Sequence, residues 1–373
     1  MKALVLKEKG IIEFVEKDEP TLSNQHGAIL KPVLVSPCTS DVHTIWQGSP
    51  KKKNLTLGHE CVAQIAEIGN EVKDFCVGDI VAVPAITPDW SQPDVNENPA
   101  HAGENFSAHM LGKSIDGAFQ EAFYIPYADK NLARIPSSVT LEQALMCVDV
   151  VSTGFTAAEE ANIKRGDTVV VMGIGAIGLA AIMGAYFYGA TKVYAVGSRK
   201  ENVKIAESLG AEVINYKTLK CELPNGMHPN ANSTNSAVVN YILTKTNTKG
   251  VDCVLICGGN DLSFPQAIDM VKYGTGIVSN VMYFGAVPGE HENGIDAIQI
   301  PKFSIGRGMA GKTLKFSLAK GGRKRIEYLM NLCAEGRIHP EVFITKRYHG
   351  LENIDSAIYD MKSRSAIKIA VQI

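Results

Sequence analysis

The chain has 373 residues, of which 45% are hydrophobic and 20% charged, and its formal net charge is −2 at pH 7. This composition is typical of a soluble globular protein, and the length favours two domains over a single core. The near-neutral charge argues against nucleic acid or an anionic membrane as a partner. Neither a signal-peptide pattern nor an apolar run of bilayer length is found, so we expect a cytoplasmic protein without a membrane partner.

The first part of the chain predicts a β-rich domain of short strands joined by turns. Apolar or alternating runs, which are typical of strands in a small barrel, lie at residues 28–35, 61–69, 80–84 and 118–125. Residues 87–117 are rich in Pro, Asn, His, Gly and Ser and predict a long loop over a site. A helical pattern then begins at Leu141 and carries Asp149 within an apolar run. This acid is either exposed or a helix cap, or it is paired with a positive group such as a metal.

The segment from Cys38 to Glu60 gathers potential metal ligands. It begins with the Cys38 thiol, continues with Ser40 and His43, and ends with the pair His59 and Glu60. Sulfur, imidazole nitrogen and carboxylate oxygen are the ligands that zinc prefers, and a catalytic site keeps one position open for substrate. The segment therefore predicts most of a catalytic zinc site. Taken singly, each residue could instead be a buried thiol, a core histidine or a surface side chain.

The second part of the chain predicts a dinucleotide-binding unit. A continuous apolar strand at 168–172 leads into a G-x-G-x-x-G turn, a helix-compatible stretch and a second apolar strand at 192–196. Glycines in such a turn let the backbone approach a pyrophosphate, and the helix N-terminus offers free N–H groups. The candidate contacts of this turn, which starts at Gly173, are Ile174, Gly175, Ala176, Ile177 and Gly178.

Helix and strand patterns continue to alternate as far as about residue 292. They predict a doubly wound parallel sheet over 153–292, with the polar residues 219–236 as a surface insertion. A strand at 366–373 ends the chain and is expected to return to the first domain. That domain would then comprise 1–152, completed by 293–373.

The end of the second strand of this unit decides the cofactor preference. An NAD site places an acidic residue there for the ribose hydroxyls, whereas this chain has Gly197, Ser198 and Arg199. Ser198 and Arg199 can hold a 2′-phosphate through charge-assisted hydrogen bonds, so we predict NADP(H). The alternative is that Arg199 merely begins the next helix on the surface.

With these motifs together, the chain resembles the zinc-dependent medium-chain alcohol dehydrogenases, and among them the microbial NADP-dependent secondary alcohol (isopropanol) dehydrogenase branch. The resemblance covers nearly the whole chain. It implies an α/β protein with a β-rich GroES-like catalytic domain, a Rossmann NADP-binding domain and a homotetrameric assembly. Its most specific motifs are Pro37-Cys38-Thr39-Ser40-Asp41-Val42-His43, Leu57-Gly58-His59-Glu60, the run 83–90, the glycine-rich turn, Gly197-Ser198-Arg199-Lys200 and the run 308–313.

Position by position, the resemblance implies roles for single residues. The zinc ligands would be Cys38, His59 and Asp149, with Glu60 as an exchangeable fourth ligand. Ser40 and His43 would relay the proton. Further residues are implied as contacts of the cofactor or substrate: Gly197, Ser198, Arg199 and Tyr216 at the 2′-phosphate, Val281, Met282 and Tyr283 beside the nicotinamide, Arg364 as a basic cofactor contact, and Ala85, Ile86 and His109 in the substrate pocket.

The implied activity is the interconversion of secondary alcohols and ketones, with aldehydes as further carbonyl substrates. His109 and Met282 stand where the branch usually has tryptophan and asparagine, and these departures bear on substrate preference. The eight cysteines show no paired spacing and predict reduced thiols. No cysteine lies between Cys76 and Cys147, so we predict one catalytic zinc per subunit and no structural zinc.

Two other functions stay open at this point. One is a zinc-free quinone or enone reductase of the same superfamily, although such enzymes lack the ligand set of Cys38, His59 and Asp149. The other is a non-catalytic protein that keeps the fold and binds NADPH without turnover.

Overall fold

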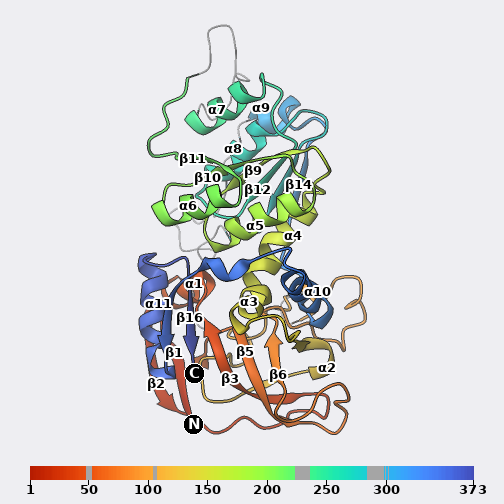
Figure 1. The fold of residues 1–373 in the computed structure, drawn as a ribbon, viewed down its shortest axis with the longest axis vertical. Coiled ribbons are helices and arrows are strands. Elements are labelled where there is room, and N and C mark those ends of the chain that lie inside the picture. The colour runs from red at the N-terminus through yellow and green to blue at the C-terminus, as the bar shows by residue number, and fades with distance from the viewer. Residues whose placement is uncertain (48–52, 104–106, 223–235, 284–297, 299, 301) are drawn as a thin grey trace. The chain divides into compact units, whose positions relative to one another are not determined.

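The computed structural model describes all residues except 48–52, 104–106, 223–235, 284–297, 299 and 301 (Figure 1). The chain forms two compact units. The first consists of Met1–Ser152 together with Ala319–Ile373, and the second is Thr153–Leu318. Most of the polar insertion predicted at 219–236 lies outside the described residues.

The first unit is built mainly from β-strands. Before the second unit it contains β1 (Lys2–Glu8), β2 (Ile11–Glu16), β3 (Ala28–Ser36), α1 (Thr39–Trp46), β4 (Leu55–Thr56), β5 (Glu60–Ile68), β6 (Ile80–Val83), η1 (Pro99–His101), β7 (Phe123–Ile125), α2 (Ala128–Asn131), β8 (Ala133–Arg134), α3 (Leu141–Met146) and η3 (Cys147–Val151). After the second unit come α10 (Arg323–Ala334), η5 (Pro340–Phe343), β15 (Ile344–His349), η6 (Leu351–Asn353), α11 (Ile354–Ser363) and β16 (Lys368–Gln372).

The strands of this unit form two sheets. A small sheet has the order β2-β1-β4, and a larger one has the order β15-β16-β3-β5-β6-β8, with β7 also paired to β3. Strand β16 pairs antiparallel with β3, with Val371 opposite Val35. The prediction that the C-terminal strand returns to the first domain is therefore confirmed.

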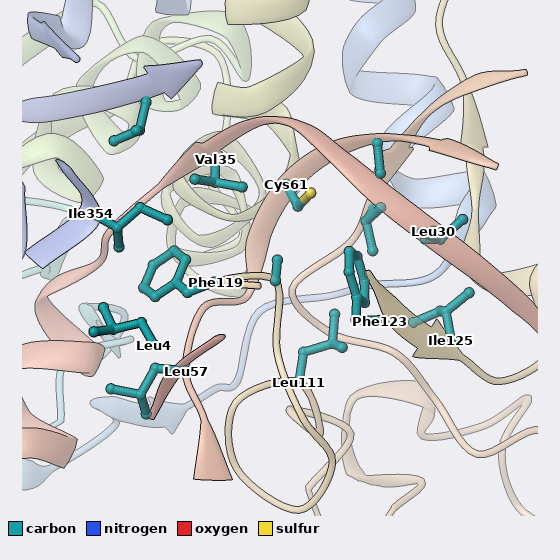
Figure 2. Packing of buried hydrophobic residues seen from close by; sticks show 14 of the residues in the cluster. Leu4, Leu30, Val35, Leu57, Cys61, Leu111, Phe119, Phe123, Ile125 and Ile354 are labelled. Carbon is teal, nitrogen blue, oxygen red and sulfur yellow. The ribbon is translucent and has the colours of Figure 1, made fainter. Parts of the chain in front are cut away.

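The core of the first unit lies between these sheets and α11. Figure 2 shows side chains from many separate segments meeting there, among them Leu4, Leu57, Phe119, Phe123 and Ile354. All five are at most 1% exposed. Because burial of apolar area is the main driving force of folding, this core holds the short strands together.

The second unit is an open parallel sheet with helices on both faces (Figure 1). The strand order is β11-β10-β9-β12-β13-β14, and every neighbouring pair is parallel. This order, with its reversal at β9, is that of a doubly wound dinucleotide-binding fold, as predicted. The elements are α4 (Ser152–Glu160), β9 (Thr168–Met172), α5 (Ala176–Phe187), β10 (Lys192–Val196), α6 (Lys200–Ser208), β11 (Glu212–Ile214), α7 (Ala237–Lys245), β12 (Cys253–Ile256), α8 (Ser263–Met270), β13 (Ile277–Asn280), α9 (Lys302–Ile305), η4 (Arg307–Met309) and β14 (Thr313–Phe316).

The C-terminal boundary of this unit differs from the sequence-based division. That division ended the unit at residue 292, whereas the structure extends it to Leu318. The reason is β14, which adds a sixth strand by pairing with β13, so that Ile277 lies opposite Thr313. Strand β14 has only four residues, and the sequence on either side of it includes charged and polar residues. Its apolar pattern is therefore too weak to predict a strand. Among the described residues, no helix is long and apolar enough to cross a membrane.

A matched pair of isoleucines tests the position of the first core. Ile125 in β7 is fully buried, whereas Ile11 in β2 is 49% exposed. Ile125→Ala should lower the free energy of unfolding of this unit by about 2–5 kcal/mol, because it removes buried methyl groups and leaves a cavity. Ile11→Ala should change it by only about 0.5 kcal/mol. Urea denaturation measures both, and equal losses would contradict the packing described here.

Candidate functional site

Cys38 occupies the N-cap of α1, directly after strand β3. Its side chain accepts a hydrogen bond from the Ser40 N–H at 3.5 Å, and its own N–H donates to Asp41 Oδ2 at 2.9 Å. The sulfur therefore sits at the positive end of a helix dipole, where negative charge is stabilised. The sequence analysis did not predict this helix, because a segment of eight residues, of which Thr39, Val42, Thr44 and Ile45 are β-branched, carries little helical signal.

Pairing of β3 with β5 brings the next two ligand candidates to Cys38. Ser36 lies opposite Glu60 at the end of this ladder, so His59 and Glu60 stand beside the segment that leads into α1. The side chains of His59 and Glu60 are 1% and 0% exposed. The antiparallel register of β3 and β5 therefore places His59 and Glu60 next to Cys38, although they follow it by about twenty residues in the sequence.

Asp149 reaches the same place from a widened helical turn. Helix α3 ends at Met146, and η3 is a π-helical turn that runs on into α4. Such turns are rare and recur at functional sites. The Asp149 side chain is 14% exposed, and its Oδ2 lies 3.7 Å from both Cys38 Sγ and His59 Nε2. The side chain is therefore not an exposed acid, and its role as a zinc ligand stays a prediction.

Cys38, His59, Glu60 and Asp149 form one compact cluster. They offer one ligand atom each, and all four atoms lie within 4.8 Å of one another. A tetrahedral zinc with ligands at about 2.0–2.3 Å would separate its donor atoms by roughly 3.3–3.8 Å, which the two measured 3.7 Å contacts match. Within the part of the chain that the structure describes, this is the one group of His, Cys and acidic residues arranged to hold a metal.

The electrostatics of the cluster call for a cation. Burial raises the pKa of Cys38, and the carboxylates of Glu60 and Asp149 raise it further. Burial likewise raises the pKa of Glu60 to about 7, with Asp149 adding to the shift and Lys368 opposing it. Three acidic groups crowded into a buried site repel one another, and a divalent ion among them removes that repulsion. The residues therefore fit a zinc ion in both donor type and charge.

The carboxylate of Asp41 lies beside the imidazole of this cluster at ion-pair distance. Its Oδ1 lies 3.4 Å from His59 Nδ1, and both side chains are at most 3% exposed. Asp41 raises the pKa of His59 and favours a proton on Nδ1, so that with a metal bound Nε2, on the side of Asp149, would be the nitrogen left to donate its lone pair. The sequence analysis missed Asp41, although the capping spacing between Cys38 and Asp41 was the signal that could have found it.

Lys368 is a second residue that the sequence analysis missed. Its Nζ donates to Glu60 Oε1 at 2.6 Å and to the Pro37 carbonyl at 3.0 Å, and the two charged side chains are 2% and 0% exposed. The other oxygen of Glu60, Oε2, is buried and has no hydrogen-bond partner among the described residues. No local pattern could reveal this contact, because β16 lies 308 positions beyond Glu60.

The predicted proton-relay residues lie on α1. Ser40 Oγ is 3.2 Å from His59 Nε2, which places the hydroxyl at the cluster. His43 lies about one turn further along the helix, and its Nδ1 is 2.5 Å from Gln47 Oε1. The structure thus brings Ser40 to the predicted ligands and leaves His43 one turn away.

Two of the three predicted pocket residues, Ala85 and His109, lie next to residues of the cluster. The Ala85 N–H donates to the Val148 carbonyl at 3.1 Å, next to Asp149. The His109 ring stands edge-on to the His59 ring at a centroid distance of 4.6 Å. Burial lowers the pKa of His109 to about 3, and its Nε2 has no hydrogen-bond partner within the described residues. Ile86 is 3% exposed and packs against Gly321.

The glycine-rich turn has the geometry expected of a nucleotide loop. It joins β9 to α5, with Gly175 at the N-cap and Ala176 and Ile177 in the first turn. A Cβ at Gly178 would lie 1.9 Å from the Gly173 carbonyl oxygen, so only glycine fits there. The N–H groups at the start of α5 have no partner within the helix, and a helix N-terminus of this kind binds the pyrophosphate in dinucleotide sites.

The remaining candidate cofactor contacts lie at the ends of other strands. Gly197, Ser198 and Arg199 follow β10, and Arg199 is the exposed N-cap of α6. The Arg199 guanidinium lies near Gly175, because a Cβ atom added to Gly175 would be 3.9 Å from Arg199 Nη2. Tyr216 follows β11 and is 53% exposed.

The nicotinamide-side candidates lie beyond a strand rather than within it. The predicted strand over 277–284 ends at Asn280, so Val281, Met282 and Tyr283 follow β13 as irregular chain. Arg364 ends α11 in the first unit, where it is exposed in a left-handed conformation. The cofactor roles of these four residues stay predictions.

Comparisons with known proteins identify relatives for both units. Residues 24–137 match the family model for the alcohol dehydrogenase GroES-like domain, and residues 176–332 match that for zinc-binding dehydrogenases. The chain is 39% identical to the NADP-dependent isopropanol dehydrogenase of Clostridium beijerinckii, over 98% of this chain and 97% of that protein. It is 40% identical to the enzyme of the same name from Entamoeba histolytica, over 100% and 96%.

A solved structure gives the same result for the fold. The alcohol dehydrogenase of Thermus sp. ATN1 superposes with a TM-score of 0.81 at 26% identity, covering 100% of this chain and 99% of that one. The comparisons in sequence and in structure both span nearly the full chain, so they cover both units.

Removal of Lys368 tests the buried ion pair with Glu60. In metal-free protein, Lys368→Met should lower the free energy of unfolding by about 3–5 kcal/mol, because it leaves a buried carboxylate without its cation. The double variant Glu60→Leu/Lys368→Met should recover much of this loss. A double-mutant cycle by urea denaturation measures the coupling, and strictly additive losses would refute the pairing.

Proposed function

Because the chain belongs to the zinc-binding alcohol dehydrogenase family, we propose that it interconverts secondary alcohols and ketones by hydride transfer with NADP(H). The observation that carries this proposal is the buried cluster of one sulfur, one nitrogen and two carboxylate ligands in the first unit. A nucleotide loop in the second unit, followed by a strand end without an acidic residue, supports the cofactor. Both curated relatives cited above bear the name of NADP-dependent isopropanol dehydrogenases.

We assign Cys38, His59 and Asp149 as the zinc ligands, with Glu60 as a fourth ligand that can give way to substrate. Bound zinc acts as a Lewis acid, which lowers the pKa of an alcohol hydroxyl and polarises a ketone. The α1 N-terminus stabilises the Cys38 thiolate. Lys368 holds one oxygen of Glu60 and leaves the other available, which suits a ligand that binds in only some states.

The proton of the alcohol leaves through side chains of α1. Ser40 Oγ, which lies beside His59 Nε2, accepts the proton of the substrate hydroxyl while its own hydroxyl proton passes on towards His43. His43, one turn further along α1, takes over the proton and passes it to water. Ala85, Ile86 and the neutral His109 ring line the substrate side of the site.

NADP(H) supplies the hydride acceptor or donor and is held by the second unit. The α5 N-terminus and residues 174–178 bind the pyrophosphate. Gly197, Ser198, Arg199 and Tyr216 bind the 2′-phosphate, for which a guanidinium offers paired hydrogen bonds. Residues 281–283 and Arg364 complete the cofactor contacts.

The two alternative functions are less consistent with the site. A zinc-free reductase has no need of a buried sulfur, imidazole and carboxylate at ligand distance. A non-catalytic NADPH-binding protein would bind nucleotide without turnover.

We further propose that the protein works in the cytoplasm as a homotetramer. Exposed apolar side chains at the end of the parallel sheet, such as Phe316 in β14 at 63% exposure, are consistent with assembly.

Two cysteine variants test the function and its metal together. The native enzyme should oxidise 2-propanol with NADP and carry one zinc per chain. Cys38→Ser should lose the zinc and reduce turnover by at least roughly 100-fold. Cys61→Ser is the control, because Cys61 is fully buried in β5 outside the cluster and should keep the metal. Turnover without zinc in undamaged protein would sink the proposal, and so would NADPH binding without any turnover.

A charge reversal tests the cofactor assignment. Arg199→Asp should weaken kcat/KM for NADP by roughly 10–100-fold, the loss expected for hydrogen bonds to a charged group, and should move the preference towards NAD. Lys204→Asp makes the same change of charge further along α6, at another exposed residue, and should keep the preference. An unchanged preference in Arg199→Asp would mean that the 2′-phosphate is held elsewhere.

A further inference from the structure

Asn202 is a buried polar residue beside the glycine-rich loop that none of the steps above uses. It lies in the first turn of α6 and is only 2% exposed. Its Nδ2 donates to the Ile174 carbonyl oxygen at 2.6 Å. Ile174 stands between Gly173 and Gly175, so this bond ties the middle of the loop to the helix that follows β10.

The bond sets the direction of one loop peptide. In a planar trans peptide, the C=O and the following N–H point in opposite directions. Because the Ile174 oxygen is directed to Asn202, the Gly175 N–H of the same peptide is directed away from it. Gly175 is the N-cap of α5, where the N–H groups have no partner within the helix. Asn202 therefore orients a donor at the end of α5 that receives an anion in dinucleotide sites.

The loop needs such a lock because glycine permits the opposite orientation. A peptide flip requires only rotation about the Ile174 ψ and the Gly175 φ, and no Cβ at Gly175 opposes it. After a flip, a carbonyl oxygen would face the phosphate and repel it. The Ile174 side chain is already fixed, since a Cβ at Gly197 would lie 2.0 Å from its Cγ1. The contact with Gly197 restrains the Ile174 side chain but not the orientation of the Ile174–Gly175 peptide, which depends on the hydrogen bond from Asn202.

We propose that Asn202 is a positioning residue for the cofactor, which holds the Ile174 carbonyl so that the Gly175 N–H is presented to the pyrophosphate of NADP(H). The inference rests on the proposed NADP(H) function. It concerns the pyrophosphate, because the bond from Asn202 ends at the peptide between Ile174 and Gly175. The candidate for the 2′-phosphate is a different residue, the exposed Arg199 at the N-cap of α6.

Two nucleotides that differ in the pyrophosphate test this role by equilibrium binding. Asn202→Leu keeps the size of the side chain and removes the donor. The Kd for NADPH should rise about tenfold, as expected for one hydrogen bond to a charged group, while the Kd for adenosine 2′-monophosphate should stay unchanged. Asn202→Asp, which is nearly isosteric and repels the carbonyl, should weaken NADPH binding at least as much and serves if the leucine variant fails to fold.

Asn240→Leu is the matched control. Asn240 lies in α7 of the same unit, is 4% exposed, and its Nδ2 likewise donates to a backbone carbonyl, that of Cys221, at 3.1 Å. This variant should bind NADPH as the native protein does. Unchanged NADPH binding in the Asn202 variants would overturn the inference, and so would an equal loss for both nucleotides or an equal loss in Asn240→Leu. Native protein that binds no NADPH would instead refute the proposed function itself.

Discussion

The buried charge balance around Glu60 is the constraint on which the catalytic unit depends. Glu60 shares its site with the thiol of Cys38 and the carboxylate of Asp149, and burial raises the pKa of both Cys38 and Glu60. Lys368 supplies one positive charge at 2.6 Å from Glu60. The neighbouring carboxylates also raise the pKa of His59, so that without a metal its imidazolium opposes part of this negative charge, whereas a divalent ion would offset the repulsion and leave His59 neutral as a ligand. A divalent metal also supplies the chemistry that we propose.

The fold of the first unit can be understood as the means of assembling this site. Strand β3 delivers Cys38 to the start of a helix, register with β5 adds His59 and Glu60, and a π-helical turn adds Asp149. The C-terminal strand then returns beside β3 and contributes Lys368. The return of the chain to its first domain therefore completes the sheet and also completes the charge balance of the site.

Local signals predicted the doubly wound sheet and the ligand candidates Cys38, His59 and Glu60, whereas Asp149 was implied as a ligand only by the family resemblance. Strands β9 and β10 and the glycine turn between them have strong apolar and glycine patterns, and the predicted strand bounds agree with the structure. What the patterns missed depends on contacts between distant segments. The contact of Lys368 with Glu60 can be recognised only once β16 is placed in the sheet. Strand β14 is recognisable only by its pairing with β13. The π-helical turn at Asp149 is a local departure from a regular helix. Asn202 looks like an ordinary helix residue until the loop lies beside it.

The central claim is that the cluster of Cys38, His59, Glu60 and Asp149 is the single zinc site of each chain. Anomalous X-ray scattering at the zinc absorption edge, recorded from crystals of the metal-replete enzyme, tests it most directly. We predict one strong anomalous peak per chain, within bonding distance of Cys38 Sγ, His59 Nε2 and an Asp149 oxygen. A metal-replete crystal without a peak at this cluster, or with its zinc bound elsewhere in the chain, would contradict the account.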